Sequence, residues 1–362
     1  MKISRADTTT VIPQINEIVE QVRKQYCPDQ RVTIWSIKVI QQDNIYCLDG
    51  ETDQKKAAQA LTTQLKSVFP NEQFLNRIVV LPDDTMRGRN FGIIVNSVES
   101  LRSGPSIFKD MLTQTLRGLP VEILKSDEEC FLVRTDDGYL GWIDDDRVVV
   151  GGDSLKAAWT KTPKVVYDDI EGVIYAEASN KSQPVADVVL GNRFKLVSKR
   201  GRWTAVELPD GRKGFIPTKQ LVAEEVYLRR KPSADKVLAT AFSLLGRPYM
   251  WGATSPKALD CSGLTQTSYR RYGVVLLRDA SMQANQGKTV DLTDLPAHLK
   301  PGDLLFFGSK PGRITHTGIY IGDSQFIHCS GRVKINSFKA EDANYSVYLL
   351  KRLQQVKRII PE

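Results

Sequence analysis

The first ninety residues combine helix-like and strand-like spacings of apolar side chains. In 11–27 the apolar residues recur every three or four positions, as on one face of a helix, and 54–69 repeat that spacing until Pro70. Between these segments apolar and polar residues alternate, as they do in half-buried strands. This order predicts a small α+β domain over 1–90. We expect helices at 11–27 and 54–69, and strands at 32–39, 45–48 and 77–81.

From about Asn90 short apolar runs are separated by Gly, Asp and Pro, a pattern typical of small antiparallel β domains. Two blocks share this rhythm, and GYLGWI at 138–143 and GFIP at 214–217 resemble the closing motif of bacterial SH3-like barrels. We therefore expect two tandem SH3-like barrels, over 91–155 and 160–225. Their predicted strands are 93–98, 121–124, 131–134 and 139–143, and then 172–176, 187–190, 193–197, 203–207 and 214–216.

The last 130 residues return to a mixed pattern. Residues 223–232 are charged, end in Pro232, and are interpreted as a linker. Ser233 then suits the cap of a helix that Gly246 ends. The chain is thus predicted to be a multidomain α+β protein whose last domain spans 232–355. In that domain we expect a second helix at 264–272 and one antiparallel sheet with strands at 302–307, 315–321 and 325–329.

Length and composition bound the class of protein. With 362 residues the chain is too long for one ordinary core, and two to four domains are expected. No uncharged apolar stretch approaches about 20 residues, so no membrane span is predicted. Residues 1–11 lack the apolar segment of a secretory signal. That pattern fits a cytoplasmic protein, and it fits equally a periplasmic or envelope protein whose leader has been removed.

The net charge of +8 has two interpretations, a solvated basic surface or attraction to anionic polymers such as the bacterial cell wall. The basic residues are spread in small groups rather than gathered in a stripe with interleaved aromatic residues, so nucleic acid is not an expected partner. The five cysteines are scattered and contain no CxxC pair. No disulfide framework is predicted, and at least one thiol is free in any pairing.

The candidate chemistry centres on Cys261, which lies in DCSG at 260–263, directly before the predicted helix. The positive end of a helix dipole stabilises a thiolate, so the position is expected to lower the pKa of the thiol. The free N–H groups of the first turn can also hold an oxyanion. An isolated cysteine is more often a buried structural residue, but the histidines of this chain change that expectation.

Two of the three histidines follow this cysteine on predicted strands. His316 and His328 stand 55 and 67 residues after Cys261, and their midpoint is Gly322, in the predicted turn at 322–324. A hairpin folded at that glycine makes the two histidines cross-strand neighbours on one face, about 5 Å apart at Cβ. A nucleophile, a base and a group that orients the base are the minimum set for covalent catalysis. His298 has no such partner and is interpreted as a loop residue.

Six motifs stand in order around these residues: YMWG at 249–252, DCSG at 260–263, RDASMQ at 278–283, LKPGDL at 299–304, HTGIY at 316–320 and IH at 327–328. In combination, over roughly 233–350, they resemble the NlpC family of papain-like peptidoglycan cysteine peptidases. With two barrels in front, the chain resembles the γ-D-glutamyl-L-diamino acid endopeptidases of that family. The order of elements in 1–90 loosely resembles the BON-type modules of envelope proteins, for which we expect a packing or docking role.

The resemblance implies a papain-like α+β catalytic domain, with a helix-borne cysteine packed on an antiparallel sheet. Cys261 is expected to be the nucleophile, His316 the general base and His328 the residue that orients the imidazole. Asp260 and Ser262 are expected to hold the free amino end of the peptide and its γ-D-Glu. Relatives often carry serine at the position of Ala280, and some carry a glutamate near 118–121, so amine capture is expected to be weaker or built differently here. The other residues expected to line the pocket are Tyr249, Trp251, Arg278, Asp279 and, from the first barrel, Tyr139.

The implied reaction is hydrolysis of the γ-D-Glu to diamino acid bond in murein stem peptides that carry a free N-terminal L-Ala, in wall turnover or recycling, without metal or cofactor. Three alternatives stay open. The barrels can bind the wall while the catalytic domain is inert. Cys261, His316 and His328 can hold a metal, although the short spacing typical of zinc ligands is absent. The same residues also serve amidase and acyl-transfer reactions.

Overall fold

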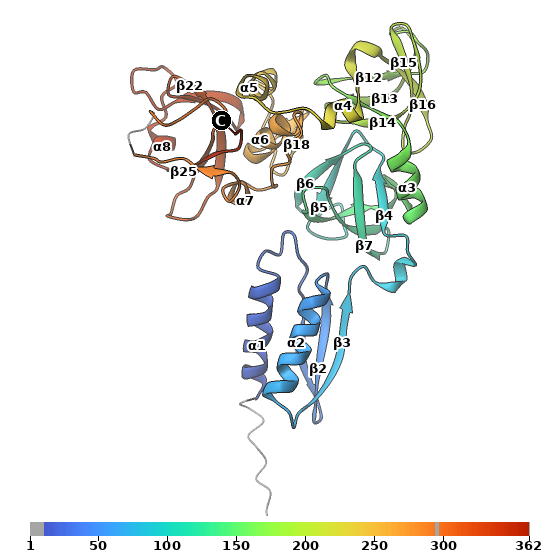
Figure 1. Cartoon of the computed structure of the whole chain (residues 1–362), viewed down its shortest axis with the longest axis vertical. Helices are drawn as coiled ribbons and strands as arrows, with labels where there is room; N and C mark the ends of the chain where they lie inside the picture. Colours follow the sequence, from blue (N-terminus) through green and yellow to red (C-terminus); the bar gives the residue numbers. More distant parts are fainter. Residues whose placement is uncertain (1–10, 294–296, 362) are drawn as a thin grey trace, which may run out of the picture.

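The computed structural model describes residues 11–293 and 297–361. Residues 1–10, which belong to the segment found to lack the pattern of a secretory signal, lie outside the described residues. Figure 1 shows an N-terminal unit (α1 to β3), a first β unit (β4 to β10) and a second β unit (β11 to β17). A C-terminal unit (α5 to β25) lies beside the first β unit. The predicted multidomain α+β organisation is confirmed at this level.

The N-terminal unit packs two helices on one three-stranded sheet. Its elements are α1 (Val11–Tyr26), β1 (Lys38–Gln42), β2 (Ile45–Thr52), α2 (Lys55–Val68) and β3 (Gln73–Val80), in the sheet order β1-β2-β3. Both predicted helices are confirmed, and their apolar faces, including Ile15 and Leu61, are fully buried in one core. The predicted strand at 32–39 is wrong before Lys38. There the backbone N–H groups of Thr33 and Ile34 donate to Asp29 and Asp53 instead of to a neighbouring strand.

The two β units have the same topology. The sheet orders are β10-β4-β7-β8-β9-β5-β6 and β17-β11-β14-β15-β16-β12-β13, so each strand of the second corresponds to the strand seven places earlier in the first. The shared rhythm of the two sequence blocks therefore reflects a structural repeat. The strands are β4 (Phe91–Ile94), β5 (Val98–Arg102), β6 (Met111–Leu116), β7 (Pro120–Asp127), β8 (Cys130–Arg134), β9 (Leu140–Asp144), β10 (Val148–Gly151), β11 (Lys164–Tyr167), β12 (Glu171–Tyr175), β13 (Pro184–Val189), β14 (Arg193–Arg200), β15 (Trp203–Glu207), β16 (Lys213–Pro217) and β17 (Leu221–Ala223).

Several boundaries differ from the sequence-based predictions for this region. The predicted strand at 93–98 is two strands, because β4 ends at Ile94 and β5 begins at Val98. Strands β6, β10, β11 and β17 were not predicted, nor was α3 (Asp153–Lys161), which joins the two units. The predicted linker at 223–232 contains α4 (Glu224–Leu228), held by the buried ring of Tyr227.

The C-terminal unit places one helix against a six-stranded sheet of order β20-β25-β21-β22-β23-β24. Helix α6 contacts β22 and β23, and its Leu264 shares a core with Phe306 and Ile319. The predicted helix and strands are confirmed, but α6 begins three residues earlier than expected, at Cys261. The elements are α5 (Ala234–Ser243), β18 (Thr254–Ser255), β19 (Ala258–Leu259), α6 (Cys261–Arg270), α7 (Ala280–Gln283), β20 (Lys288–Thr289), β21 (Leu304–Phe307), β22 (His316–Gly322), β23 (Gln325–Ser330), β24 (Arg332–Ser337), α8 (Val347–Leu350) and β25 (Leu353–Arg358).

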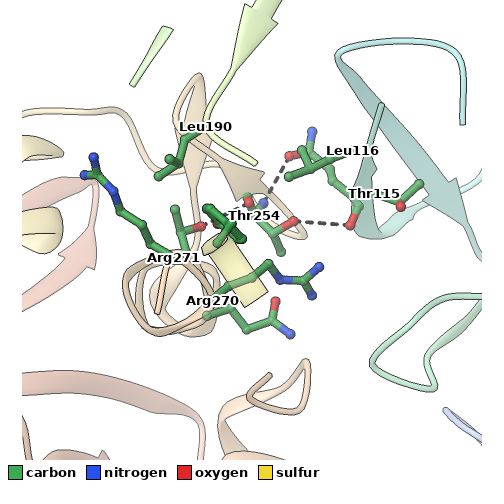
Figure 2. Close-up of a pocket in the computed structure, with 10 residues that line it drawn as sticks. Thr115, Leu116, Leu190, Thr254, Arg270 and Arg271 are labelled. Carbon is green, nitrogen blue, oxygen red and sulfur yellow. Dashed lines mark hydrogen bonds between the residues drawn. The ribbon is translucent and has the colours of Figure 1, made fainter. Parts of the chain in front are cut away.

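Polar contacts join the first β unit to its neighbours on both sides. Towards the N-terminal unit, Arg134 forms an ion pair with the buried carboxylate of Asp53. Towards the C-terminal unit, the backbone N–H of Thr254 donates to Oε1 of Gln114 at 3.0 Å, and its hydroxyl donates to the Gln114 carbonyl at 3.2 Å. Figure 2 shows these bonds beside a cavity of about 20 Å³, roughly the space of one water, lined also by Arg270. Among the described residues no helix has the length and apolar character needed to cross a membrane.

Candidate active site

Cys261 is the first residue of α6, and the sequence around it explains why the helix begins there. Asp260 is the N-cap residue, and its carboxylate accepts a hydrogen bond from the backbone N–H of Gly263 at 2.7 Å. A Cβ at position 263 would stand 2.1 Å from the carbonyl oxygen of Ala253, so only glycine fits. The cap and the glycine together fix the thiol at the N-terminus of α6, where Cys261 is 8% exposed.

The environment of the thiol differs from the sequence-based expectation. Backbone N–H groups of Thr317 and Ser262 donate to the sulfur and favour the thiolate, as expected at a helix N-terminus. Burial and the nearby carboxylate of Asp260 act in the opposite direction and are stronger, and they raise the pKa of Cys261 to about 12. The predicted lowering of the thiol pKa is therefore wrong, because loss of hydration outweighs the helix dipole.

The two histidines meet on one face of the β22–β23 hairpin, but not in the predicted register. Gly322 pairs with Gln325, so the turn is centred between Asp323 and Ser324. A bulge between Tyr320 and Gly322 makes Gly318 the residue opposite His328. His316 and His328 are therefore diagonal rather than direct neighbours, and the ring of His316 reaches across Gly318, which has no side chain. The ring centroids are 5.0 Å apart at an interplanar angle of 85°.

Asn336 determines the tautomers of both histidines. Its Nδ2 donates to the backbone carbonyl of Asn344 at 2.7 Å, so its Oδ1 faces His328 and accepts from Nε2 at 2.8 Å. His328, neutral, then accepts at Nδ1 from Nε2 of His316, at 2.8 Å. His316 thus carries its proton on Nε2, and the lone pair of its Nδ1 is its basic position. The next residue, Thr317, donates its backbone N–H to the Cys261 sulfur, so His316 is one residue away from a direct contact with the thiol.

Both imidazoles are neutral near pH 7. Burial lowers the pKa of His316 to about 3, helped by the positive charges of Lys334 and Arg352. Burial likewise lowers the pKa of His328 to about 4, against the opposing effect of the bond to Asn336. A neutral thiol beside a neutral imidazole can react by transferring its proton as the sulfur attacks.

Asp260 is buried and has partners for both carboxylate oxygens. Oδ1 accepts from Gly263 and Ser262, and Oδ2 accepts from the backbone N–H of Gly252 at 3.0 Å. Arg278, also buried, forms an ion pair with Oδ2 at 2.5 Å and donates to the hydroxyl of Ser262 at 2.8 Å. The carboxylate and the guanidinium hold the start of α6 against the segment before α7. Both oxygens of Asp260 are thus already engaged by donors of the protein itself.

Asp279 is the more accessible carboxylate, with a side chain 31% exposed, and three units of the chain meet on it. Tyr139, directly before β9, donates its hydroxyl proton to Oδ2 at 3.1 Å. Arg31, in the loop after α1, donates to the same oxygen at 2.8 Å and to the hydroxyl of Ser281 at 2.9 Å. Asp29 fixes that guanidinium through two further bonds, at 2.8 and 2.6 Å. In Figure 1 the loop after α1 points towards α7.

The side chains of three other residues singled out from the sequence take no part in this hydrogen-bond network. Tyr249 is half-buried against the core of the C-terminal unit, and burial raises its pKa to about 12. The indole of Trp251 is 70% exposed and lies on the surface. His298 lies in an exposed turn, as expected.

Asn336 and Arg31 were not among the predicted site residues. Asn336 stands eight residues after His328, and only the β23–β24 register, which pairs Phe326 with Asn336, shows that the two strands are adjacent. Arg31 lies 248 residues before Asp279, in a segment without a recognisable motif. In the part of the chain that the structure describes, no group of three His, Cys, Asp or Glu side chains is placed to hold a metal ion.

Comparison with known sequences identifies related proteins. The model of the NlpC/P60 family matches residues 246–356. The chain is 31% identical over 231 residues to the gamma-D-glutamyl-L-lysine dipeptidyl-peptidase of Bacillus cereus, a match that covers 60% of this chain and 66% of that protein. It is 28% identical over 267 residues to dipeptidyl-peptidase 6 of Lysinibacillus sphaericus, which covers 70% of this chain and 93% of that protein.

Solved structures extend the likeness beyond the C-terminal unit. The crystal structure of an NlpC/P60 family protein from Bacillus cereus superimposes with a TM-score of 0.65 at 23% identity, over 75% of this chain and 100% of that chain. An NlpC/P60 endopeptidase from Photobacterium damselae subsp. piscicida gives a TM-score of 0.57 at 15% identity, over 97% of this chain and 90% of that one. At these identities the matches concern the fold alone.

Proposed function

Residues 246–356 make this chain a member of the NlpC/P60 family, and from that membership we propose that it is a cysteine endopeptidase of murein stem peptides. The bond cut is the amide between γ-D-Glu and the diamino acid. The observation that carries the proposal is the hydrogen-bonded series from Asn336 through His328 to His316, which ends with a basic nitrogen beside the Cys261 thiol. The names of two relatives, a gamma-D-glutamyl-L-lysine dipeptidyl-peptidase and a dipeptidyl-peptidase, support this substrate class.

The reaction proceeds through a thioester. Nδ1 of His316 takes the thiol proton while the sulfur of Cys261 attacks the γ-carbonyl carbon of D-Glu and forms the S–C bond. The carbonyl oxygen gains negative charge, which the backbone N–H of Cys261, the first residue of α6, stabilises. Collapse breaks the C–N bond, and His316 returns the proton to the leaving amine. Water, deprotonated by His316, then cleaves the thioester and releases the L-Ala-D-Glu half and the thiol.

Asp279 is the carboxylate that we assign to the free amino end of the substrate. It is accessible, and Tyr139 and Arg31 hold it in place. Asp260 is expected from the family to share this role. Here it acts indirectly on Asp279, because it orients the neighbouring residue Arg278 and the start of α6. Ser262 completes that support, and Tyr249 and Trp251 line the approach to the thiol. A carboxylate at this end of the site suits short peptides that carry a free L-Ala amine.

We also propose a division of the chain into four domains, over 1–90, 91–155, 160–225 and 232–355, in which the middle two are SH3-like. Four hydrophobic cores, each formed almost entirely by residues of one segment, support the division; Met86 and Ile170 are the residues that pack on the core of another segment. The identical strand order of the two β units, and the GYLGWI and GFIP motifs that fall in β9 and β16, support the SH3-like assignment. In this arrangement the first barrel contributes Tyr139 to the site.

The activity is tested by incubating L-Ala-γ-D-Glu-meso-diaminopimelate with the wild-type protein and Cys261→Ala, and identifying the products by mass spectrometry. We expect L-Ala-D-Glu and free diaminopimelate from the wild type, and none from Cys261→Ala. Cys130→Ala, which removes another buried thiol in the first β unit, is the matched control and should keep full activity. Equal turnover by Cys261→Ala would overturn the assignment.

The amine end is tested with Asp279→Asn and an N-acetylated copy of the same tripeptide. Loss of one charge-assisted hydrogen bond, about 1.5–3 kcal/mol, predicts a rise in KM for the free-amine peptide of roughly tenfold or more. The N-acetylated peptide should be a poor substrate for both proteins and should not distinguish them. Asp323→Asn, a similar loss of charge in an exposed turn, is the control. Equal KM values for Asp279→Asn and the wild type would exclude Asp279 from amine binding.

A further inference from the structure

A cavity of about 370 Å³ opens beside the two histidines, on the side of the C-terminal unit that carries α8. In Figure 1 α8 lies at the outer edge of that unit, away from the β units and from the loop that carries Arg31. Cys261, Asp260 and Asp279 are not among the residues that line it. Those residues are Phe307, Thr315, His316, His328, Ser330, Lys334, Asn336, Ser346, Tyr348, Leu349 and Arg352.

The charge of this cavity is positive and unbalanced. Lys334 and Arg352 line it, and no Asp or Glu does. Among the described residues neither side chain forms an ion pair; Arg352 lies over the ring of Tyr348, at 4.6 Å from its centroid. The other arginines around the active site, Arg278 and Arg31, are both paired with carboxylates. Two cations without a carboxylate in a half-open cavity form a binding site for an anionic group.

The position of the cavity relative to the two histidines indicates which part of a substrate it would bind. Lys334 stands directly opposite His328 in the β23–β24 register, and both cations are near enough to His316 to lower its pKa. His316 delivers the proton to the leaving amine, so the leaving half of the substrate extends past this histidine. The half that stays on the sulfur extends the other way, towards Asp279. The cavity therefore lies on the leaving-group side.

We propose that the cavity lined by Lys334 and Arg352 binds the carboxylates of the leaving diamino acid. This inference rests on the proposed function and specifies its substrate. The side chain of meso-diaminopimelate ends in a carboxylate beside an ammonium group, whereas that of lysine ends in an ammonium group alone. Two cations can pair with the terminal carboxylate of the first but only repel the terminal group of the second. The protein therefore prefers peptides of diaminopimelate to peptides of lysine.

The test compares kcat/KM for L-Ala-γ-D-Glu-meso-diaminopimelate and L-Ala-γ-D-Glu-L-Lys in the wild-type protein and three variants. We expect the wild type to prefer the diaminopimelate peptide by about tenfold or more, the value of one charge-assisted contact. Lys334→Met and Arg352→Met should each reduce that preference by roughly tenfold, through kcat/KM for the diaminopimelate peptide. Lys334→Glu should raise kcat/KM for the lysine peptide above that of the wild type, a gain that misfolding cannot produce.

Lys351→Met is the matched control, because Lys351 is exposed, adjacent to Arg352 and outside the cavity. It should retain the preference of the wild type. Equal hydrolysis of both peptides by the wild type, or the same loss on both peptides in Lys334→Met and Arg352→Met with no gain in Lys334→Glu, would overturn this inference and leave the peptidase assignment intact. Hydrolysis of neither peptide would overturn both.

Discussion

Replacing Asn336 with leucine tests the proton arrangement on which the site depends. Asn336→Leu keeps a side chain of similar size but removes the oxygen that accepts from Nε2 of His328 at 2.8 Å. His328 is only 1% exposed, and the leucine side chain takes the place of the amide between it and the adjoining cavity, so its N–H is left without an acceptor. An unsatisfied buried donor costs about 1–3 kcal/mol. His328 avoids this cost if its proton moves to Nδ1, where the N–H donates to His316.

That shift reverses the proton on the second ring as well. His316 must accept at Nε2 and carry its own proton on Nδ1, the nitrogen that should receive the thiol proton. A bias of about 1–3 kcal/mol corresponds to a factor of about 5–150 in the population of the competent tautomer. We therefore expect kcat to fall by about 5–150-fold with little change in KM. The wrong tautomer of a catalytic histidine is known to be costly in hydrolases.

Two assays measure this prediction, steady-state kinetics on the defined tripeptide and nitrogen NMR of histidine-labelled protein. The chain has three histidines, so the ring signals of His316 and His328 can be assigned with single variants. In the wild type both should carry the proton on Nε2. Asn344→Ala is the control, because Asn336 uses the backbone carbonyl of that residue and not its side chain. A kcat that falls in Asn336→Leu while both tautomers stay unchanged would refute the reasoning.

Three further predictions follow from the geometry. Because the pKa of Cys261 is raised to about 12, alkylation by iodoacetamide should accelerate about tenfold per pH unit from neutral pH towards pH 9; a rate already maximal at neutral pH would indicate a preformed ion pair. Gly318→Ala places a Cβ 3.0 Å from that of His328, so kcat should fall while thermal unfolding moves by a few degrees; full activity would contradict the packing. Arg31→Met removes one of the two groups that hold Asp279 in place, so KM for the free-amine tripeptide should rise severalfold; an unchanged or lower KM would contradict the positioning role of Arg31.

Local signals in the sequence were sufficient for much of the fold and for the centre of the site. The DCSG motif predicted a cysteine at the N-terminal end of a helix, although the Asp260 cap and the start of α6 at Cys261 itself were not predicted. The spacing of the histidines predicted their meeting on one hairpin. The exact register was not predictable, because a bulge after Tyr320 depends on packing rather than on a residue pattern. The pKa of the thiol was predicted in the wrong direction, because burial of a side chain is a property of the assembled core.

The role of Arg31 in the candidate site was not predictable from the sequence, because it depends on contacts between units. Arg31 reaches Asp279 only because the N-terminal unit is docked on the first β unit, through the Arg134–Asp53 ion pair and the backbone bond from Leu140 to the Arg31 carbonyl. A packing or docking role was expected for the N-terminal unit. In addition, its Arg31 contacts Asp279 of the candidate site. No local pattern in 11–80 encodes such a long-range position.

In the proposed reaction Cys261 forms a thioester with the γ-D-glutamyl half of the substrate. Rapid mixing of the protein with L-Ala-γ-D-Glu-meso-diaminopimelate, acid quenching and intact mass spectrometry measure this intermediate directly. We expect a mass increase equal to one L-Ala-γ-D-Glu acyl group, located on Cys261 by peptide mapping and absent from Cys261→Ala. Hydrolysis of the peptide with no adduct on Cys261, or with the adduct on another residue, would contradict it.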